Sequence, residues 1–407
     1  MFRVVAVLVG MTIFLSPFAD ASFYSDVQPI LQENCVTCHR PSGDDTMGMV
    51  APMPLRTYKE VRPWAKSIAR QVAERTMPPW HADPEFHGVF ENERTLTDAQ
   101  IKTIVDWVKS GANRGPGSEP ELAKEESTGW TIGEPDLTVP FDEPYWVEDW
   151  VDDYYASIRV TLDEDILPED QWIKGMQLRP GSEVVHHIVV FSDSAPRSMG
   201  FPMGMLGGTG PGTDATSFPE GYGRSLEEGT TLTFNMHYHK EAGPGTGMWD
   251  NSKIGFTFHD APVHHEVSWG AVGTMYFTIP ANASNHEVIA EETFRDDTTL
   301  LALFPHTHLR GKASKYTAYY PDGTEEVLLN VPKYDFNWQT NYVFKEPKKI
   351  PAGTRIKVQM WYDNSQERAE YTGIDPSRTV RFGEPTTDEM MFGWIDYTSS
   401  EVSQSDD

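Results

Sequence analysis

Hydrophobic residues recur every three to four positions in the first third of the chain, which is the spacing of helices with one buried face. This pattern predicts helices at the beginning of 24–40, around 57–75 and over 97–110. The last of these has the clearest ends, because Thr97 and Gln100 form a capping box and Gly111 closes the helix. The pattern therefore predicts a small all-helical domain at the N-terminal end.

From residue 130 onward the pattern changes to short runs rich in β-branched and aromatic residues, separated by Gly, Pro, Asn and Asp. The clearest runs are 157–162, 182–191, 230–239, 252–259, 299–308 and 354–363. Convincing helices are scarce here, so the spacing favours β-sandwiches or barrels. Because roughly 270 residues exceed the usual size of one sandwich, we expect two.

These changes of pattern divide the chain into expected domains. A segment rich in Pro, Gly, Ser and charged residues separates the helices from the strands, and this composition is typical of a linker. The expected divisions are a helical domain at 22–115, the linker at 116–129, β-sandwiches at 130–268 and 269–400, and a disordered acidic tail at 401–407.

The N-terminal 21 residues have the features of a signal peptide. Arg3 precedes an apolar stretch from Val4 to Leu15, and Ala19-Asp20-Ala21 fits a small-residue cleavage site. The apolar stretch is too short to span a bilayer comfortably, and no later segment is long and apolar enough. We expect an exported protein, periplasmic or secreted, that does not span the membrane.

The formal net charge is −28, from 61 acidic and 33 basic residues. Such a surface repels phosphate backbones, so nucleic acid is excluded as a partner. The acidic run 142–155 is expected to be a solvated face, with a docking site for a basic redox partner as the alternative.

The chain has two cysteines, both in the sequence Cys35-Val36-Thr37-Cys38-His39. This is the attachment pattern of a c-type haem, in which His39 becomes an iron ligand. A disulfide, a redox pair and half a zinc site are the alternatives, but the other zinc ligands and a βαβ context are missing. With the "MPPW" loop, residues 22–115 resemble small bacterial cytochrome c domains, which implies one covalent haem c.

The second axial ligand of the haem is assigned to Met77, which two prolines hold just past a helix. A methionine opposite a histidine suits electron transfer. The competing candidates are Met47, Met49, Met53 and His81, and Met77 would otherwise simply pack.

Histidines cluster in the β-rich runs. His306 and His308 are two residues apart, so in a strand they share one face. The adjacent pair His186 and His187 needs a bulge or strong twist to point the same way. His237 and His239 share a face of another run, and the methionines Met390 and Met391 follow near the C-terminus. Imidazole and thioether without thiolate suit copper that cycles between Cu(I) and Cu(II).

In this arrangement residues 130–400 resemble the copper type II, ascorbate-dependent monooxygenases, which include peptidylglycine α-hydroxylating and dopamine β-monooxygenases. The resemblance assigns one copper to His186, His187 and His237, and a second to His306, His308 and Met390. It implies two β-sandwiches of the jelly-roll type, each with one copper. The second copper would activate O₂, the first would deliver an electron, and a C–H bond of a small organic substrate would be hydroxylated.

Three departures from the family matter. The β region lacks cysteine and is therefore disulfide-free. Phe304, Phe392 and Trp394 stand where the amidating enzyme has the arginine, asparagine and tyrosine that grip a peptide carboxylate, so we expect an apolar or aromatic substrate. The added haem is expected to replace ascorbate, with electrons from a periplasmic redox protein or a small reductant.

Other readings remain open from the sequence. A periplasmic copper-binding electron carrier would use the same ligands without a substrate pocket, and a zinc hydrolase would use three histidines. The pair His264 and His265 is expected to be an ordinary polar feature, with metal ligation as the alternative; His239 could replace His237 because both share a face, and the resemblance to the family favours His237. The methionines at 199, 203 and 205 are expected to lie in a Gly/Pro loop.

Overall fold

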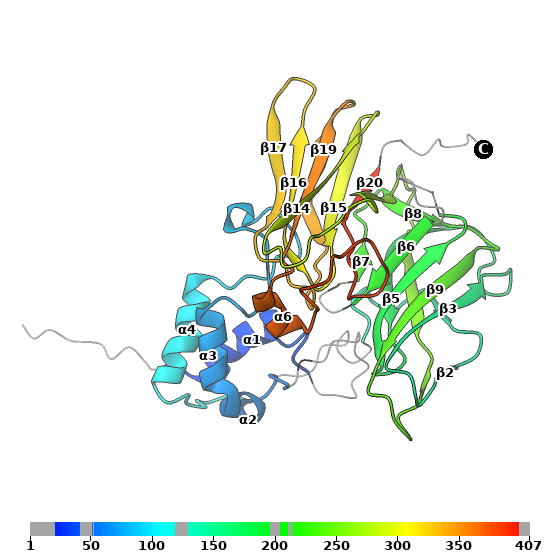
Figure 1. The fold of residues 1–407 in the computed structure, drawn as a ribbon. Helices are drawn as coiled ribbons and strands as arrows, with labels where there is room; N and C mark the ends of the chain where they lie inside the picture. The colour runs from blue at the N-terminus through cyan, green and yellow to red at the C-terminus, as the bar shows by residue number, and fades with distance from the viewer. Residues whose placement is uncertain are drawn as a thin grey trace, which may run out of the picture.

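The protein is described from a computed structural model, which covers residues 21–40, 51, 53–118, 129–195, 204–210, 213 and 215–398. Nearly all of the expected signal peptide and most of the linker, Met47, Met49, Met199, Met203 and the acidic tail lie outside the described residues. The described part is a small helical region followed by a region made mostly of β-strands (Figure 1). No helix within the described ranges is long and apolar enough to cross a membrane.

The helical region contains the three predicted helical segments. Its elements are η1 (Phe23–Val27), α1 (Gln28–Asn34), α2 (Tyr58–Val61), η2 (Arg62–Trp64), α3 (Ala65–Ala73), η3 (Pro84–Phe86) and α4 (Asp98–Lys109). The capping box of Thr97 and Gln100 is present at the start of α4 as predicted. The single helix expected over 57–75 is wrong in detail, because a 3-10 turn containing Pro63 divides it. Proline lacks an N–H, which explains the break. Phe23, Leu31 and Trp107 pack together at the centre of this region.

Two sheets form the first half of the β region, and their strands are antiparallel except that β12 runs parallel to β8. One has the strand order β3 (Asp153–Thr161), β9 (Thr231–His239), β5 (Val185–Ser192), β6 (Gly204–Thr209). The other has the order β1 (Leu137–Pro140), β11 (Lys253–Phe258), β4 (Gln171–Arg179), β8 (Tyr222–Leu226), β12 (His265–Glu266), with β7 (Thr216–Ser217) beside β4. A short ribbon pairs β2 (Tyr145–Val147) with β10 (Met248–Asp250). Apolar residues of both sheets form one core, so the sheets pack face to face.

The second half of the β region repeats this arrangement. One sheet has the order β13 (Ser268–Gly273), β20 (Phe392–Thr398), β15 (Thr298–His306), β18 (Tyr342–Ile350). The other has the order β14 (His286–Thr293), β19 (Arg355–Tyr362), β16 (Gly311–Tyr319), β17 (Glu325–Val331), and a short helix α6 (Gln366–Thr372) follows β19. A second core lies between these sheets. All six predicted runs are strands, whereas the domain boundary at 268/269 stays a prediction.

An arm of the helical region, residues 80–94, joins the core of the second pair of sheets. Phe90 is almost fully buried in that core and forms a bridge with Phe344 of β18. The ring of Trp80 meets that of Tyr342 edge-on at 5.0 Å between centroids. The main-chain N–H of Asp83 donates to the carbonyl of Asn330 at 2.8 Å. The arm thus fixes the helical region against β17 and β18. In Figure 1 the arm, drawn in light blue, lies beside β17.

Candidate metal centres

Cys35, Cys38 and His39 lie in one turn at the end of α1. The N–H groups of Cys38 and His39 both donate to the carbonyl of Cys35, at 3.2 and 2.9 Å. The two cysteines are not joined in a disulfide, and burial raises the pKa of Cys35 to about 12. The Nδ1 of His39 lies 3.0 Å from the carbonyl of Met53. With Nδ1 donating there, Nε2 of His39 keeps its lone pair for a metal.

These residues fit a covalently attached haem c. Arg40, next to His39, is buried, and its Nε finds no hydrogen-bond partner in the part of the chain that the structure describes. A buried cation of this kind calls for an anionic group nearby, which the haem propionates would supply. Two thiols, one imidazole with a free Nε2 and a buried guanidinium therefore suit the group.

The candidates for the second axial ligand differ in position. Met77 follows α3 and is 43% exposed, so its sulfur is accessible. Met53 packs beside the core of the helical region. Burial lowers the pKa of His81, and Asp335 of the β region lies near it, so His81 belongs to the contact with the β region. The assignment to Met77 stays a prediction.

The first histidine cluster brings together His186, His187 and His237. Their ligand atoms lie within 4.8 Å of one another. The Nδ1 of His187 is 3.2 Å from the Nδ1 of both other rings. The pairing of β5 with β9 shifts register between Val185 and His187, which is the irregularity that two adjacent histidines need to face one way. The three Nδ1 atoms therefore converge as a metal would require.

Two neighbours hold His237 in place. Its Nε2 donates to the carboxylate of Asp153, and its ring stacks on Tyr155 with centroids 4.3 Å apart. Since Nε2 carries the hydrogen, Nδ1 faces the other two histidines as an acceptor. The acidic run 142–155 was expected to be a solvated face or a docking site; Asp153 is 43% exposed and, in addition, contacts a candidate ligand. His239 is exposed, and its ring centroid lies 6.3 Å from that of His186.

We expect Asp153→Asn to weaken copper binding at the three-histidine cluster by about 10–100-fold, because the carboxylate orients His237 from outside the metal site. Titration against a chelator of known affinity measures this, with copper content at saturation as a second readout. Asp165→Asn, an exposed change in the same half of the β region, is the matched control. Equal affinities for both variants would contradict the assignment.

The second histidine cluster lies at the end of β15. The rings of His306 and His308 meet edge-on with centroids 5.4 Å apart. The sequence suggested that both histidines lie in one strand. β15 ends at His306, however, and His308 lies in the loop that follows. The Nδ1 of His306 is 2.7 Å from Oε1 of Gln339, and the Nδ1 of His308 is 3.3 Å from the carbonyl of Asp388. Both Nε2 atoms are therefore left for a metal.

Glu389 joins this histidine loop to the segment that carries Met390. Its side chain accepts from the main-chain N–H of His308 at 2.8 Å and of Arg310 at 2.6 Å. It also accepts from the N–H of Met390 at 3.3 Å. Burial raises the pKa of Glu389 to about 8, and these N–H groups oppose the rise. Met391 is fully buried in the core, whereas Met390 lines the same cavity as the two histidines.

The imidazoles of both clusters are held neutral. Burial, reinforced by neighbouring histidines, lowers the pKa of His186 to about 4 and that of His308 to about 3. The pKa values of His187, His237 and His306 are lowered too, chiefly by burial. Neutral imidazoles carry the lone pairs that metals bind. Five imidazoles and one thioether suit copper, so the residues fit the expected ion.

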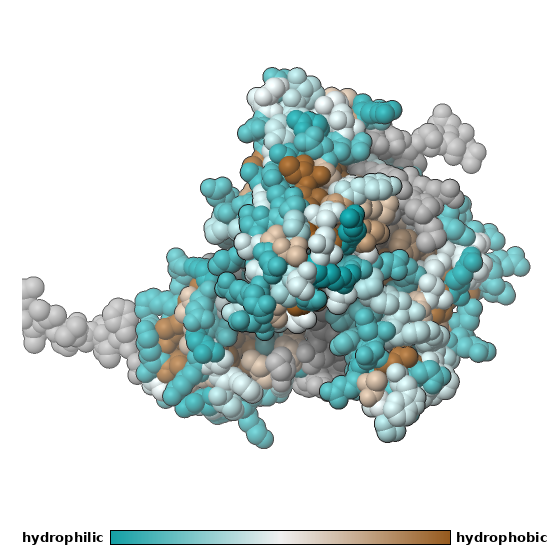
Figure 2. Space-filling model, viewed as in Figure 1, coloured by the Kyte–Doolittle hydropathy of each residue, from teal (hydrophilic) through white to brown (hydrophobic). Residues whose placement is uncertain are grey.

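Both clusters open into one cavity of about 530 Å³ between the two halves of the β region. Phe304, Phe392 and Trp394 all line it, together with Trp269 and Phe382. These side chains form an aromatic wall beside Met390. The outer surface is largely hydrophilic in the view of Figure 2, with separate small hydrophobic patches.

The cavity also contains one buried ion pair. Arg224 donates through Nη2 to Asp396 at 3.0 Å and through Nε to the carbonyl of Val267 at 3.2 Å. It is the one Arg or Lys among the described residues that line the cavity. Its guanidinium is thus already engaged by the protein.

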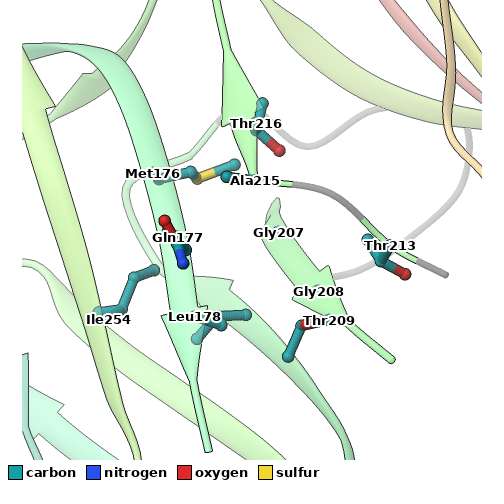
Figure 3. A pocket seen from close by; sticks show the side chains of 10 residues that line it. All are labelled: Met176, Gln177, Leu178, Gly207, Gly208, Thr209, Thr213, Ala215, Thr216 and Ile254. Carbon is teal, nitrogen blue, oxygen red and sulfur yellow. The ribbon is translucent and has the colours of Figure 1, made fainter. Parts of the chain in front are cut away.

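A second, much smaller pocket lies between β4, β6 and β7 (Figure 3). Its volume is about 10 Å³, which is the space of a single water molecule. Met176 points across it toward Gly207, where an added Cβ would meet the Met176 methyl at 2.9 Å. This pocket is too small to hold a substrate.

Sequence reasoning missed Asp153, Gln339, Phe336 and Glu389 as neighbours of the ligands. Glu389 directly precedes Met390 in the sequence, but its contacts with the histidine loop leave no sequence signal. The pair His264 and His265 was expected to be an ordinary polar feature; the ring of His265 stacks on Tyr222 at 4.7 Å, and neither histidine is among the described residues that line the large cavity.

Comparison with known proteins identifies the helical region. Residues 25–112 match the family model "Cytochrome c". The chain therefore carries a cytochrome c domain, which implies a haem c, electron transfer and a partner that exchanges electrons with it. No curated protein matches the chain.

The solved structures that align with this chain do so weakly. The major capsid protein P2 of bacteriophage PM2 is 10% identical, with a TM-score of 0.26 over 66% of this chain and 98% of its own. The VP2 subviral particle of infectious bursal disease virus is 12% identical, with a TM-score of 0.19 over 67% and 75%. A Paenibacillus xanthan lyase is 8% identical, with a TM-score of 0.18 over 70% and 27%. None of these carries an argument about function.

Proposed function

We propose that the protein is an exported haem- and copper-dependent monooxygenase that hydroxylates a C–H bond of a small apolar or aromatic substrate with O₂. The observation that carries the proposal is that one cavity of about 530 Å³ is lined by an aromatic wall and by histidines of both clusters, namely His186, His187, His306 and His308. This volume lies in the usual range of small-molecule sites, about 300–1,000 Å³. A pure electron carrier has no need of such a cavity.

The two ligand sets suit different tasks. Copper, when bound, supplies one-electron chemistry and O₂ activation. The soft thioether of Met390 favours Cu(I), and the two Nε2 atoms of His306 and His308 complete a set that leaves open coordination. The three Nδ1 atoms of the first cluster hold an ion with little change of ligation between its two oxidation states. The halves of the β region would each be a jelly-roll sandwich with one copper.

The walls of the cavity select against anionic substrates. Phe304, Phe392 and Trp394 offer apolar ring surface next to the second cluster. Arg224 is already paired with Asp396, so a substrate carboxylate would find no available cation among the described lining residues. Burying an unpaired carboxylate costs several kcal/mol, which favours a neutral substrate.

The cytochrome c domain would supply the electrons. Its arm is packed into the core of the second half of the β region, the half that carries His306 and His308. An external donor, a periplasmic redox protein or a small reductant, would reduce the haem. The signal peptide predicted at 1–21 would direct export.

Metal analysis followed by O₂ uptake tests the proposal. The expected result is one haem and two copper ions per chain, with O₂ uptake and ¹⁸O incorporation stimulated by ethylbenzene and not by phenylacetate, its anionic counterpart. Two coppers without substrate-dependent uptake would favour an electron carrier instead. Zinc in place of copper would favour a hydrolase.

A further inference from the structure

The connection between β17 and β18, residues 332–341, touches the cytochrome c domain and both histidine clusters. We propose that this connector carries electrons from the cytochrome c domain to the His306/His308 cluster through Gln339, and onward to the three-histidine cluster through Phe336. This inference rests on the proposed function, since it assigns a route between the centres proposed there.

The connector is bound to the arm of the cytochrome c domain at its C-terminal end. The Nδ2 of Asn92 donates to the carbonyl of Asn341 at 2.7 Å, and Oδ1 of Asn92 accepts from the N–H of Val343 at 3.2 Å. The guanidinium of Arg94 lies over the Trp338 ring at 5.6 Å. These contacts join the two parts by direct hydrogen bonds and ring packing.

Two residues before Asn341, the side chain of Gln339 reaches the second cluster. Its Oε1 is 2.7 Å from the Nδ1 of His306. Tyr334, at the other end of the connector, donates through its hydroxyl to the carbonyl of Thr307 at 3.0 Å. From Asn92 to His306 the path thus consists of covalent bonds and two short hydrogen bonds.

Phe336 occupies the space between the two clusters. Its ring stacks on that of His186 at 6.4 Å and 19°, and it meets the ring of His308 edge-on at 6.1 Å. The side chain is 8% exposed and lines the cavity. An electron tunnels much faster through packed atoms than through an equal width of solvent, so the ring is the favoured route between the clusters.

One electron moves at each step of this route. A ferrous haem would become ferric as one cupric ion held by His306, His308 and Met390 became cuprous. Because the thioether of Met390 favours Cu(I), this electron would pass to a cupric ion at the three-histidine cluster as a second electron from the re-reduced haem replaced it, so that both coppers would end cuprous. No proton moves, so the buried neutral imidazoles need not change protonation.

The test uses the full chain loaded with haem and copper. Two electrons per molecule are injected by a photoreductant that reduces the haem, the first oxidation of the haem is followed by absorbance, and reduction of the three-histidine copper is followed by freeze-quench EPR. For Phe336→Leu we expect unchanged haem oxidation and a delay of about tenfold at the three-histidine copper, which equals about 1.4 kcal/mol in activation free energy.

Matched variants make the outcome specific. Phe258→Leu changes a ring that stacks on Phe256 in the first half of the β region and is not among the described residues that line the cavity, and it should behave as wild type. Phe336→Tyr keeps the ring and should also keep the wild-type rate. Copper content and EPR parameters must remain those of wild type in every variant.

The results separate this inference from the proposed function. If two coppers bind and haem is oxidised, but Phe336→Leu leaves the second step unchanged, the connector route is wrong while the monooxygenase proposal stands. A slower haem oxidation in Phe336→Leu would overturn the assigned entry point. If no copper binds, the proposed function itself fails.

Discussion

Replacing His308 by alanine is expected to leave the protein with one copper ion instead of two, and to lower substrate-dependent O₂ uptake at least about 1,000-fold, equivalent to about 4 kcal/mol in activation free energy. His308 is 4% exposed, and its Nδ1 is directed at the carbonyl of Asp388. Without its Nε2, His306 and Met390 remain as the only proposed ligands of that copper, too few to hold it.

Three measurements decide the His308→Ala prediction. Copper per chain is determined by elemental analysis, O₂ uptake with an electrode, and the haem spectrum shows that the cytochrome c domain is intact. His265→Ala is the matched control, because its ring stacks on Tyr222 and neither ring is among the described residues that line the cavity. Retention of two coppers, or of substrate-dependent uptake, would remove His308 from the site.

The order of the main elements could be predicted because the hydrophobic pattern is local. The capping box at Thr97 is a signal within four residues, and it appears as expected at the start of α4. The bulge before His187 was required by the chemistry of two adjacent ligands, and β5 has it. The break inside 57–75 was missed, although Pro63 was the visible signal.

The neighbours of the ligands could not be predicted, because they depend on contacts between distant parts of the chain. Asp153 meets His237 across 84 positions, and Glu389 meets the N–H of His308 across 81. Asp153 lies in an acidic run whose composition indicates only solvation. The position of the arm, which joins Asn92 to Asn341, follows from tertiary packing that no periodicity records.

The arm and the connector also explain how one chain can combine a haem with the two proposed coppers. A flexible tether would let the cytochrome c domain sample many orientations. Here Phe90 is buried in the core of the second half of the β region, and so the domain is held at one face. Because the cytochrome c domain is fixed against the β region, it would not have to find the copper sites by diffusion before each electron transfer.

Glu389→Ala is expected to destabilise the protein by at least about 3 kcal/mol, because it leaves the N–H groups of His308, Arg310 and Met390 without their acceptor in a buried region, at roughly 1–3 kcal/mol each. These hydrogen bonds join the loop that carries His308 to the segment that carries Met390. The copper of that cluster should therefore bind more weakly even in molecules that remain folded.

Urea unfolding of the haem-loaded protein measures the first effect as a lower midpoint with an unchanged slope, and copper titration measures the second. Glu389→Gln keeps one carbonyl acceptor and should give an intermediate loss. Glu384→Ala removes a carboxylate that lines the same cavity, and no hydrogen bond to the histidine loop is seen for it among the described residues, so it should change neither quantity. If Glu389→Ala unfolded at the wild-type urea concentration and bound copper normally, the three hydrogen bonds would not be what joins the two ligand segments.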